Sequence, residues 1–347
     1  MDHSKDSAVL VLGMHRSGTS CMAGLLNILG LYTGPKSTII PSDENNPKGY
    51  FEDTSVVSCN DKLLATDSIK NLALKEIKIG IDNKHFIESF SWLFESWNSF
   101  SADSSDRFDS SINSAIRAFM LDKPTDAIPV IKDPRLCLTL PLWLRIVNVK
   151  SVIFMVRNPV SVAESLYKRD SIPFQTSFDV WFNYNQHCLN NIKSLPYKIV
   201  NYDSLLSDKE STIKNVCSFL NLNQNGLDEK IDQAKNFITS DLNRSTSLSD
   251  NSCSNEISKA FNDLVEKNTL SNYPNYSQKV LSARWEQAYY AAYSAFNLKI
   301  NQLTVEMANA ELERINKHPI SGPLIKLLRI LKNDPDFGKL KTSMRNY

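Results

Sequence analysis

The chain has 347 residues, of which 42% are hydrophobic and 22% are charged, and this supply of apolar residues is enough to bury a sizeable core. Its 39 Lys and Arg residues nearly balance 38 Asp and Glu residues, so the formal net charge is +1. No global field therefore recruits nucleic acid or an anionic surface, and we expect no nucleic-acid partner.

The cysteines and the apolar runs indicate the cellular compartment of the protein. The six cysteines form no CxxC pair and no metal-ligand spacing with the five histidines, so we expect reduced thiols and no metal requirement. The apolar run near the N-terminus is too short for a signal peptide, and no later stretch approaches the roughly 18 apolar residues that a membrane span needs. We therefore expect a cytoplasmic protein.

Four short runs rich in β-branched residues predict strands, at residues 8–12, 128–131, 151–156 and 198–200. Each run is continuously or almost continuously apolar, as in strands of a parallel sheet that is covered on both faces. Between them, residues 19–29 show helical spacing and stop at Gly30, and Asn158 with Pro159 forms a helix start. This alternation predicts an α/β core.

Three other segments are assigned by their composition. Residues 68–126 are polar, Ser-rich and aromatic in patches, and we expect helical insertions above the sheet on the substrate side. Residues 243–255 are predicted to form a loop or lid. The last segment, 276–347, is expected to be a helical C-terminal extension.

The end of that extension reads as a basic amphipathic helix of about three turns. From Ile320 on, apolar residues gather on one face and basic residues surround it. Such a helix either packs on the rest of the chain or makes a peripheral contact with a membrane, and we keep both alternatives. The residues concerned are Leu324, Leu327, Leu328, Leu331, Lys326, Arg329 and Lys332.

The loop "GMHRSGTS" at residues 13–20 lies between the first predicted strand and a predicted helix. Backbone N–H groups in such a turn point at one spot, and the helix N-terminus adds its positive end, so an anion site follows. Arg16 adds a fixed fork of donors. Position 19 holds Thr where a nucleoside triphosphate loop has Lys, which favours an anion neutralised by the protein itself over a triphosphate with metal.

A second anion motif follows the third strand. Arg157, Asn158 and Pro159 stand at this strand-to-helix junction, and Ser165 lies eight residues after the Arg. The third predicted strand thus ends in a cation, Arg157, at the start of a helix.

Together the two motifs resemble sulfotransferases that use 3'-phosphoadenosine 5'-phosphosulfate (PAPS). In that family a [KR]-S-G-T-[TS] loop holds the 5'-phosphosulfate, and R-[DN]-P with the following Ser binds the 3'-phosphate. The resemblance implies a P-loop-containing nucleoside triphosphate hydrolase-like α/β fold, with a central parallel sheet flanked by helices. It assigns nucleotide binding to His15, Arg16, Ser17, Gly18, Thr19, Ser20, Arg157 and Ser165.

Further segments extend the resemblance over about residues 8–225 and imply a sulfotransferase domain at residues 1–275. "IKDPR" is similar to the K-D-P segment of the tyrosylprotein branch, whose lysine, here Lys132, stabilises the leaving group. "IVNYDSLL" is similar to the stretch that closes the nucleotide site and assigns Tyr202, and "LNRST" assigns Arg244. "NNPKGYFED" resembles bacterial members. The motifs are closest to bacterial enzymes and to the tyrosylprotein and carbohydrate branch.

Sulfuryl transfer to a hydroxyl requires a general base and cations at the departing phosphate oxygen. We expect Arg16 and Lys132 to stabilise the leaving group, and Glu52, which follows a turn signal that returns the chain over the loop, to be the base. Asp133 and the histidines His15, His85 and His187 remain alternative bases. The similarity to bacterial forms favours a hydroxyl on a glycan or glycolipid precursor as acceptor.

Two other functions remain open at this point. The chain could be a P-loop kinase or NTPase, in which Asp133 would hold the metal, or a catalytically silent nucleotide-binding protein of the same fold. Tight binding of adenosine 3',5'-bisphosphate without magnesium would exclude the first, and turnover would exclude the second. The sequence does not indicate an oligomeric state.

Overall fold

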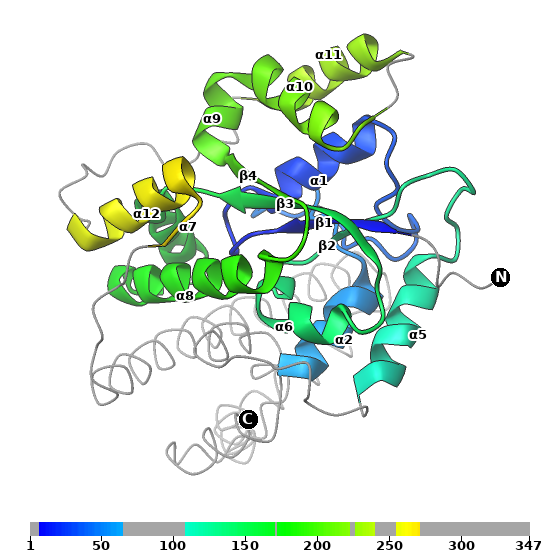
Figure 1. Cartoon of the computed structure of the whole chain (residues 1–347), viewed down its shortest axis with the longest axis horizontal. Helices are drawn as coiled ribbons and strands as arrows, with labels where there is room; N and C mark the ends of the chain where they lie inside the picture. The colour runs from blue at the N-terminus through cyan, green and yellow to red at the C-terminus, as the bar shows by residue number, and fades with distance from the viewer. Residues whose placement is uncertain (1–6, 65–107, 171, 223–225, 240–254, 271–347) are drawn as a thin grey trace, which may run out of the picture.

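A computed structural model describes residues 7–64, 108–170, 172–222, 226–239 and 255–270 (Figure 1). Arg244, His85, most of the predicted lid and the predicted C-terminal extension lie outside the described residues, as do residues 68–107 of the predicted insertion region. A search of the described helices finds none with the length and apolar character needed to cross a membrane.

Four parallel strands form the sheet in the order β2-β1-β3-β4. They are β1 (Ala8–Leu12), β2 (Val130–Lys132), β3 (Val149–Val156) and β4 (Tyr197–Asn201). All four predicted strands are confirmed, although the second begins at Val130 and not at residue 128. Pro129 cannot donate a hydrogen bond; its carbonyl accepts from the Val9 N–H at 2.8 Å, and its bridge with Tyr32 is isolated.

Helices cover both faces of this sheet, which confirms the predicted α/β class (Figure 1). One face carries α1 (Thr19–Ile28), α9 (Tyr202–Ser207), α10 (Lys209–Phe219) and α11 (Leu227–Phe237). The core on the other face is built with α2 (Thr54–Leu64), α5 (Asp109–Phe119), α6 (Leu136–Trp143), α7 (Pro159–Asp170), α8 (Phe174–Ile192) and α12 (Asn255–Lys267).

The two cores explain the continuous apolar runs. Val9 and Val11 pack with α1 on one face, whereas Leu10 and Leu12 pack into the core on the other. Because successive side chains of a strand point to opposite faces, a strand buried on both faces must be apolar at every position. All residues of β1 are at most 2% exposed.

The parallel arrangement places the carboxyl ends of all four strands at one edge of the sheet. The loop that begins at Gly13 follows β1, and Lys132 is the last residue of β2. Arg157 follows β3 directly, and Tyr202 follows β4. Residues that are far apart in the sequence are therefore brought together at this edge, where open α/β sheets bind their ligands.

Candidate active site

The loop between β1 and α1 is a tight turn with two left-handed residues. Arg16 has φ of 69° and Gly18 has φ of 89°, and the Ser17 N–H donates to the Met14 carbonyl at 3.1 Å. Gly18 is the N-cap of α1, and within the described residues no side chain caps this helix. Its first N–H groups are therefore available to an anion in the cleft.

Tyr202 closes this loop from the side of β4. A Cβ atom built on Gly18 would lie 2.2 Å from Cδ2 of Tyr202, so only glycine allows the aromatic ring to approach so closely. The Arg157 guanidinium lies 4.9 Å from the centre of the same ring, and its Nη1 donates to the Arg16 carbonyl at 3.1 Å. The two anion motifs, 141 residues apart, thus meet at one place.

Arg16 lies near two other basic residues of the cleft, Arg169 and Arg157. Its Nε donates to Ser165 Oγ at 2.7 Å, and its two Nη atoms donate to the Asn45 carbonyl at 3.4 and 3.3 Å. Burial, with the neighbouring cations Arg169 and Arg157, lowers the pKa of Arg16 to about 10. A bound anion would relieve this repulsion between cations.

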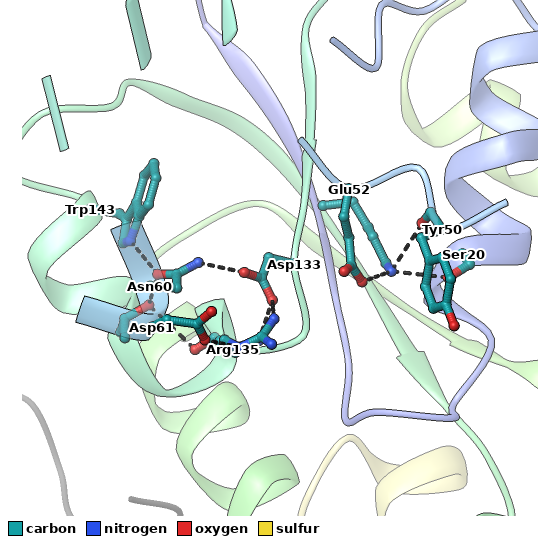
Figure 2. Close-up of polar contacts among 10 residues, drawn as sticks. Ser20, Tyr50, Glu52, Asn60, Asp61, Asp133, Arg135 and Trp143 are labelled. Atoms are coloured by element: carbon teal, nitrogen blue, oxygen red, sulfur yellow. Dashed lines mark hydrogen bonds and ion pairs between the residues drawn. The ribbon is translucent and has the colours of Figure 1, made fainter. Parts of the chain in front are cut away.

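Lys132 reaches from the end of β2 to the loop. Its ammonium donates to Ser20 Oγ at 3.0 Å, to the Tyr50 carbonyl at 3.2 Å and to the Glu52 carboxylate (Figure 2). The Lys132 side chain is 1% exposed and that of Glu52 is 11% exposed. The two residues assigned to leaving-group stabilisation and proton removal therefore form an ion pair beside the start of α1.

These side chains line one cleft, whose empty space is about 770 Å³ when the open solvent at its mouth is counted. The lining includes five cations and one carboxylate, Glu52. Such a lining, together with a helix N-terminus, suits a ligand that carries several negative charges. The cations are Arg16, Lys48, Lys132, Arg157 and Arg169.

Comparison with known proteins identifies the family of this chain. A family model described as "Sulfotransferase family" matches residues 8–226, which is more than half of the chain. The chain belongs to the sulfotransferase family. This membership confirms the predicted family, the enzyme class and the P-loop-like fold. No curated protein matches this sulfotransferase.

Several solved structures are similar to this sulfotransferase at low identity. The sulfotransferase domain of the Synechococcus PCC 7002 olefin synthase is 17% identical, with 83% of this chain and 96% of that chain covered and a TM-score of 0.38. A sulfotransferase from Mycobacterium avium is 12% identical over 70% of this chain and 69% of its own, with a TM-score of 0.40. A mouse sulfotransferase complexed with PAP is 14% identical, with coverages of 82% and 83% and a TM-score of 0.33.

Most of the predicted site residues of this sulfotransferase lie at the cleft. Ser17 and Ser165 are not among the described residues that line it: Ser165 contacts Arg16, whereas the Ser17 hydroxyl is buried without a hydrogen-bond partner in the described part of the chain. The residues that line it are His15, Arg16, Gly18, Thr19, Ser20, Glu52, Lys132, Arg157 and Tyr202.

Arg169 is a cleft residue of this sulfotransferase that the sequence analysis missed. It lies in the last turn of α7 and pairs with Asp170 at 2.6 Å. Residues four apart share one face of a helix, so its position four residues after Ser165 was the signal that could have found it.

His15 lies in the loop and is buried. Its ring makes an edge contact with Tyr184, with ring centres 5.9 Å apart. Burial, followed by the positive charge of Arg135, lowers the pKa of His15 well below its usual range. We therefore expect a neutral imidazole at pH 7.

Asp133, the alternative base, lies in a buried network beside the cleft (Figure 2). Its Oδ1 accepts from the Arg135 backbone N–H and Nη1, each at 3.0 Å, and its Oδ2 accepts from Asn60 Nδ2 at 2.9 Å. Although burial by itself lowers the pKa of Arg135, Asp133 and Asp61 outweigh it and raise that pKa. Asp133 is fully buried, and its carboxylate is committed to these structural contacts.

Proposed function

We propose that this sulfotransferase moves the sulfuryl group of PAPS to a hydroxyl of a glycan or glycolipid precursor in the cytoplasm, with Glu52 as the general base. The observation that carries this proposal is the position of the Lys132 ammonium between the Glu52 carboxylate and Ser20 of the loop at residues 13–20, called the phosphate loop from here on. A cation for the leaving group and an acceptor for the proton thus stand side by side.

In this reaction Glu52 takes the proton of the acceptor hydroxyl as its oxygen bonds to sulfur. The bond from sulfur to the 5'-phosphate oxygen breaks, and its electron pair stays on the phosphate. Lys132, Arg16 and the N–H groups at the start of α1 stabilise this charge, and one such donor typically contributes about a hundredfold or more in rate. The contacts of Asp133 favour Glu52 over it as the base.

We assign the 3'-phosphate to the second anion motif. Arg157 supplies a buried guanidinium at the end of β3, and Arg169 adds a second positive charge to the cleft. The Ser165 hydroxyl accepts from Arg16 and keeps its own proton to donate to a phosphate oxygen. Tyr202 closes the site over Gly18.

Calorimetry with adenosine 3',5'-bisphosphate in a chelator-containing buffer tests the nucleotide assignment. We expect binding without magnesium and no comparable binding of ATP. A requirement for magnesium, or a preference for ATP, would overturn the assignment. Transfer of radiolabelled sulfate from PAPS to a panel of glycans and glycolipids then tests turnover. If the protein binds the bisphosphate but turns over no PAPS, even with water as acceptor, it is a catalytically silent nucleotide-binding protein.

A further inference from the structure

A buried polar network links the helix that follows Glu52 to the residue that follows Lys132 (Figure 2). Its central pair is Asn60 of α2 and Asp133, both 0% exposed, with Asn60 Nδ2 donating to Asp133 Oδ2 at 2.9 Å. Asp133 also accepts from Arg135, and Nε of Arg135 lies 2.8 Å from Asp61 Oδ1 on α2. Two neighbouring residues of α2 are thus tied to the turn after β2.

Trp143 fixes the direction of these hydrogen bonds. Its indole Nε1 can only donate, and it donates to Asn60 Oδ1 at 2.8 Å. Thr139 Oγ1 donates to the same oxygen at 2.7 Å. The Asn60 amide therefore cannot turn over, its Nδ2 must face residue 133, and residue 133 must present an acceptor.

The two ends of this network lie close in sequence to Glu52 and Lys132. Glu52 stands two residues before α2, and the Asp53 side chain accepts from the Ser55 N–H at 2.9 Å at the start of that helix. Lys132 directly precedes Asp133. Movement of α2 relative to β2 would therefore change the separation of Glu52 and Lys132.

We infer that Asn60 and Asp133 are positioning residues that hold Glu52 and Lys132 at their working separation. This inference rests on the proposed function, because it assigns the two catalytic roles to that pair. Burial makes the link effective: a polar group without its partner inside the protein is costly, so the pairing is strongly favoured over a displaced arrangement. A displacement of about 1 Å can lower turnover by about a hundredfold.

An exchange of the two side chains tests the inference. In Asp133→Asn the side-chain oxygen must still accept from Arg135, so the new NH₂ group faces the NH₂ group of Asn60. Asn60→Asp places two carboxylates face to face. The double variant Asn60→Asp/Asp133→Asn keeps the formal charge and restores one donor opposite one acceptor. We expect each single variant to lose about a hundredfold in PAPS turnover, with bisphosphate affinity nearly unchanged, and the double variant to recover most of the loss.

A second measurement reports the geometry without turnover. A water-soluble carbodiimide joins a carboxylate to an adjacent amine as an amide with loss of water, and peptide mass spectrometry detects the Glu52–Lys132 product. The exposed pair Glu210–Lys214, 2.7 Å apart on α10, is the internal reference. At a temperature where circular dichroism shows every variant folded, we expect a strongly reduced Glu52–Lys132 yield in the single variants only.

Single variants that melt earlier but form the Glu52–Lys132 amide as the wild type does would overturn the inference, because the network would then support only the fold. A double variant that recovers neither yield nor turnover would overturn it as well. If the yields follow the expected pattern while Glu52→Gln retains full turnover, the positioning role stands and the proposed base is wrong.

Discussion

Lys132 and Glu52, 80 residues apart in the sequence, form an ion pair whose ammonium also donates to Ser20 Oγ at 3.0 Å. One side chain thus contacts both the phosphate loop and the proposed base. Because the cation and the carboxylate have different proposed tasks, substitutions at the two positions should have different kinetic signatures.

Replacing Glu52 tests proton removal. Glu52→Gln keeps the size of the side chain but cannot take the acceptor proton, so we expect turnover to fall by roughly 10² to 10⁴. Affinity for adenosine 3',5'-bisphosphate, measured by calorimetry, should stay within a factor of a few. Undiminished turnover would move the base to another residue, of which Asp133 and the histidines are the candidates.

Lys132→Ala is the matched comparison for that variant. It should also lower turnover, but through the leaving group. Its defect should therefore shrink with a donor whose leaving group is a weaker base, whereas the defect of Glu52→Gln should not. The same response of both variants to the donor would argue against separate roles.

Replacing Arg157 tests the 3'-phosphate assignment. A hydrogen bond to a charged group contributes roughly 1.5 to 3 kcal/mol, so Arg157→Ala should weaken adenosine 3',5'-bisphosphate about tenfold or more. Adenosine 5'-phosphosulfate lacks the 3'-phosphate and should bind nearly as before. Equal losses for both ligands would indicate that Arg157 acts by supporting the Arg16 carbonyl, to which its Nη1 donates.

Gly18→Ala tests the contact between the loop and Tyr202. The new Cβ would displace the Tyr202 ring, so we expect weaker bisphosphate binding in addition to lower stability. Gly226→Ala is the control, because Gly226 also has positive φ, 69°, but has nothing within 4 Å of an added Cβ. It should cost about 1 to 2 kcal/mol of stability from backbone strain and leave binding unchanged. Similar binding losses in both variants would exclude a local effect of Tyr202.

The buried His15 predicts a loss of stability in acid. Its pKa is lowered in the folded protein, so the unfolded chain binds more protons once the pH falls below about 6.5. The unfolding free energy of the ligand-free protein should therefore decrease as the pH is lowered from about 7.5 to about 5.5. The decrease should be smaller in His15→Gln. Identical pH profiles by chemical denaturation would contradict this role for His15.

A truncation tests whether the basic amphipathic helix predicted at the C-terminus, the basic tail, contacts a membrane. If it binds membranes, the intact protein should sediment with anionic liposomes, because apolar burial and basic charge act together, and a version ending near Lys317 should stay in solution. Neutral liposomes are the control for the electrostatic part. The same distribution for both proteins would leave packing on the domain as the role of the tail.

The four strands, the phosphate loop and the second anion motif could be predicted from the sequence because each is a local pattern. Continuous apolar runs indicate strands buried on two faces, and a loop such as 13–20 between a strand and a helix indicates an anion site wherever it occurs. The family membership follows from the same local motifs, since they carry the chemistry in the right order along the chain.

Only the tertiary structure decided which side chains meet. The pairing of Lys132 with Glu52, the contact of Arg16 with Ser165 and the place of Arg169 in the cleft involve residues on different strands, loops and helices. Likewise, Lys132 and Asp133 are adjacent in sequence, yet one lines the cleft and the other is held by Asn60. A motif determines the residues at a strand end, but the direction of each side chain depends on alternation along the chain and on what packs against it.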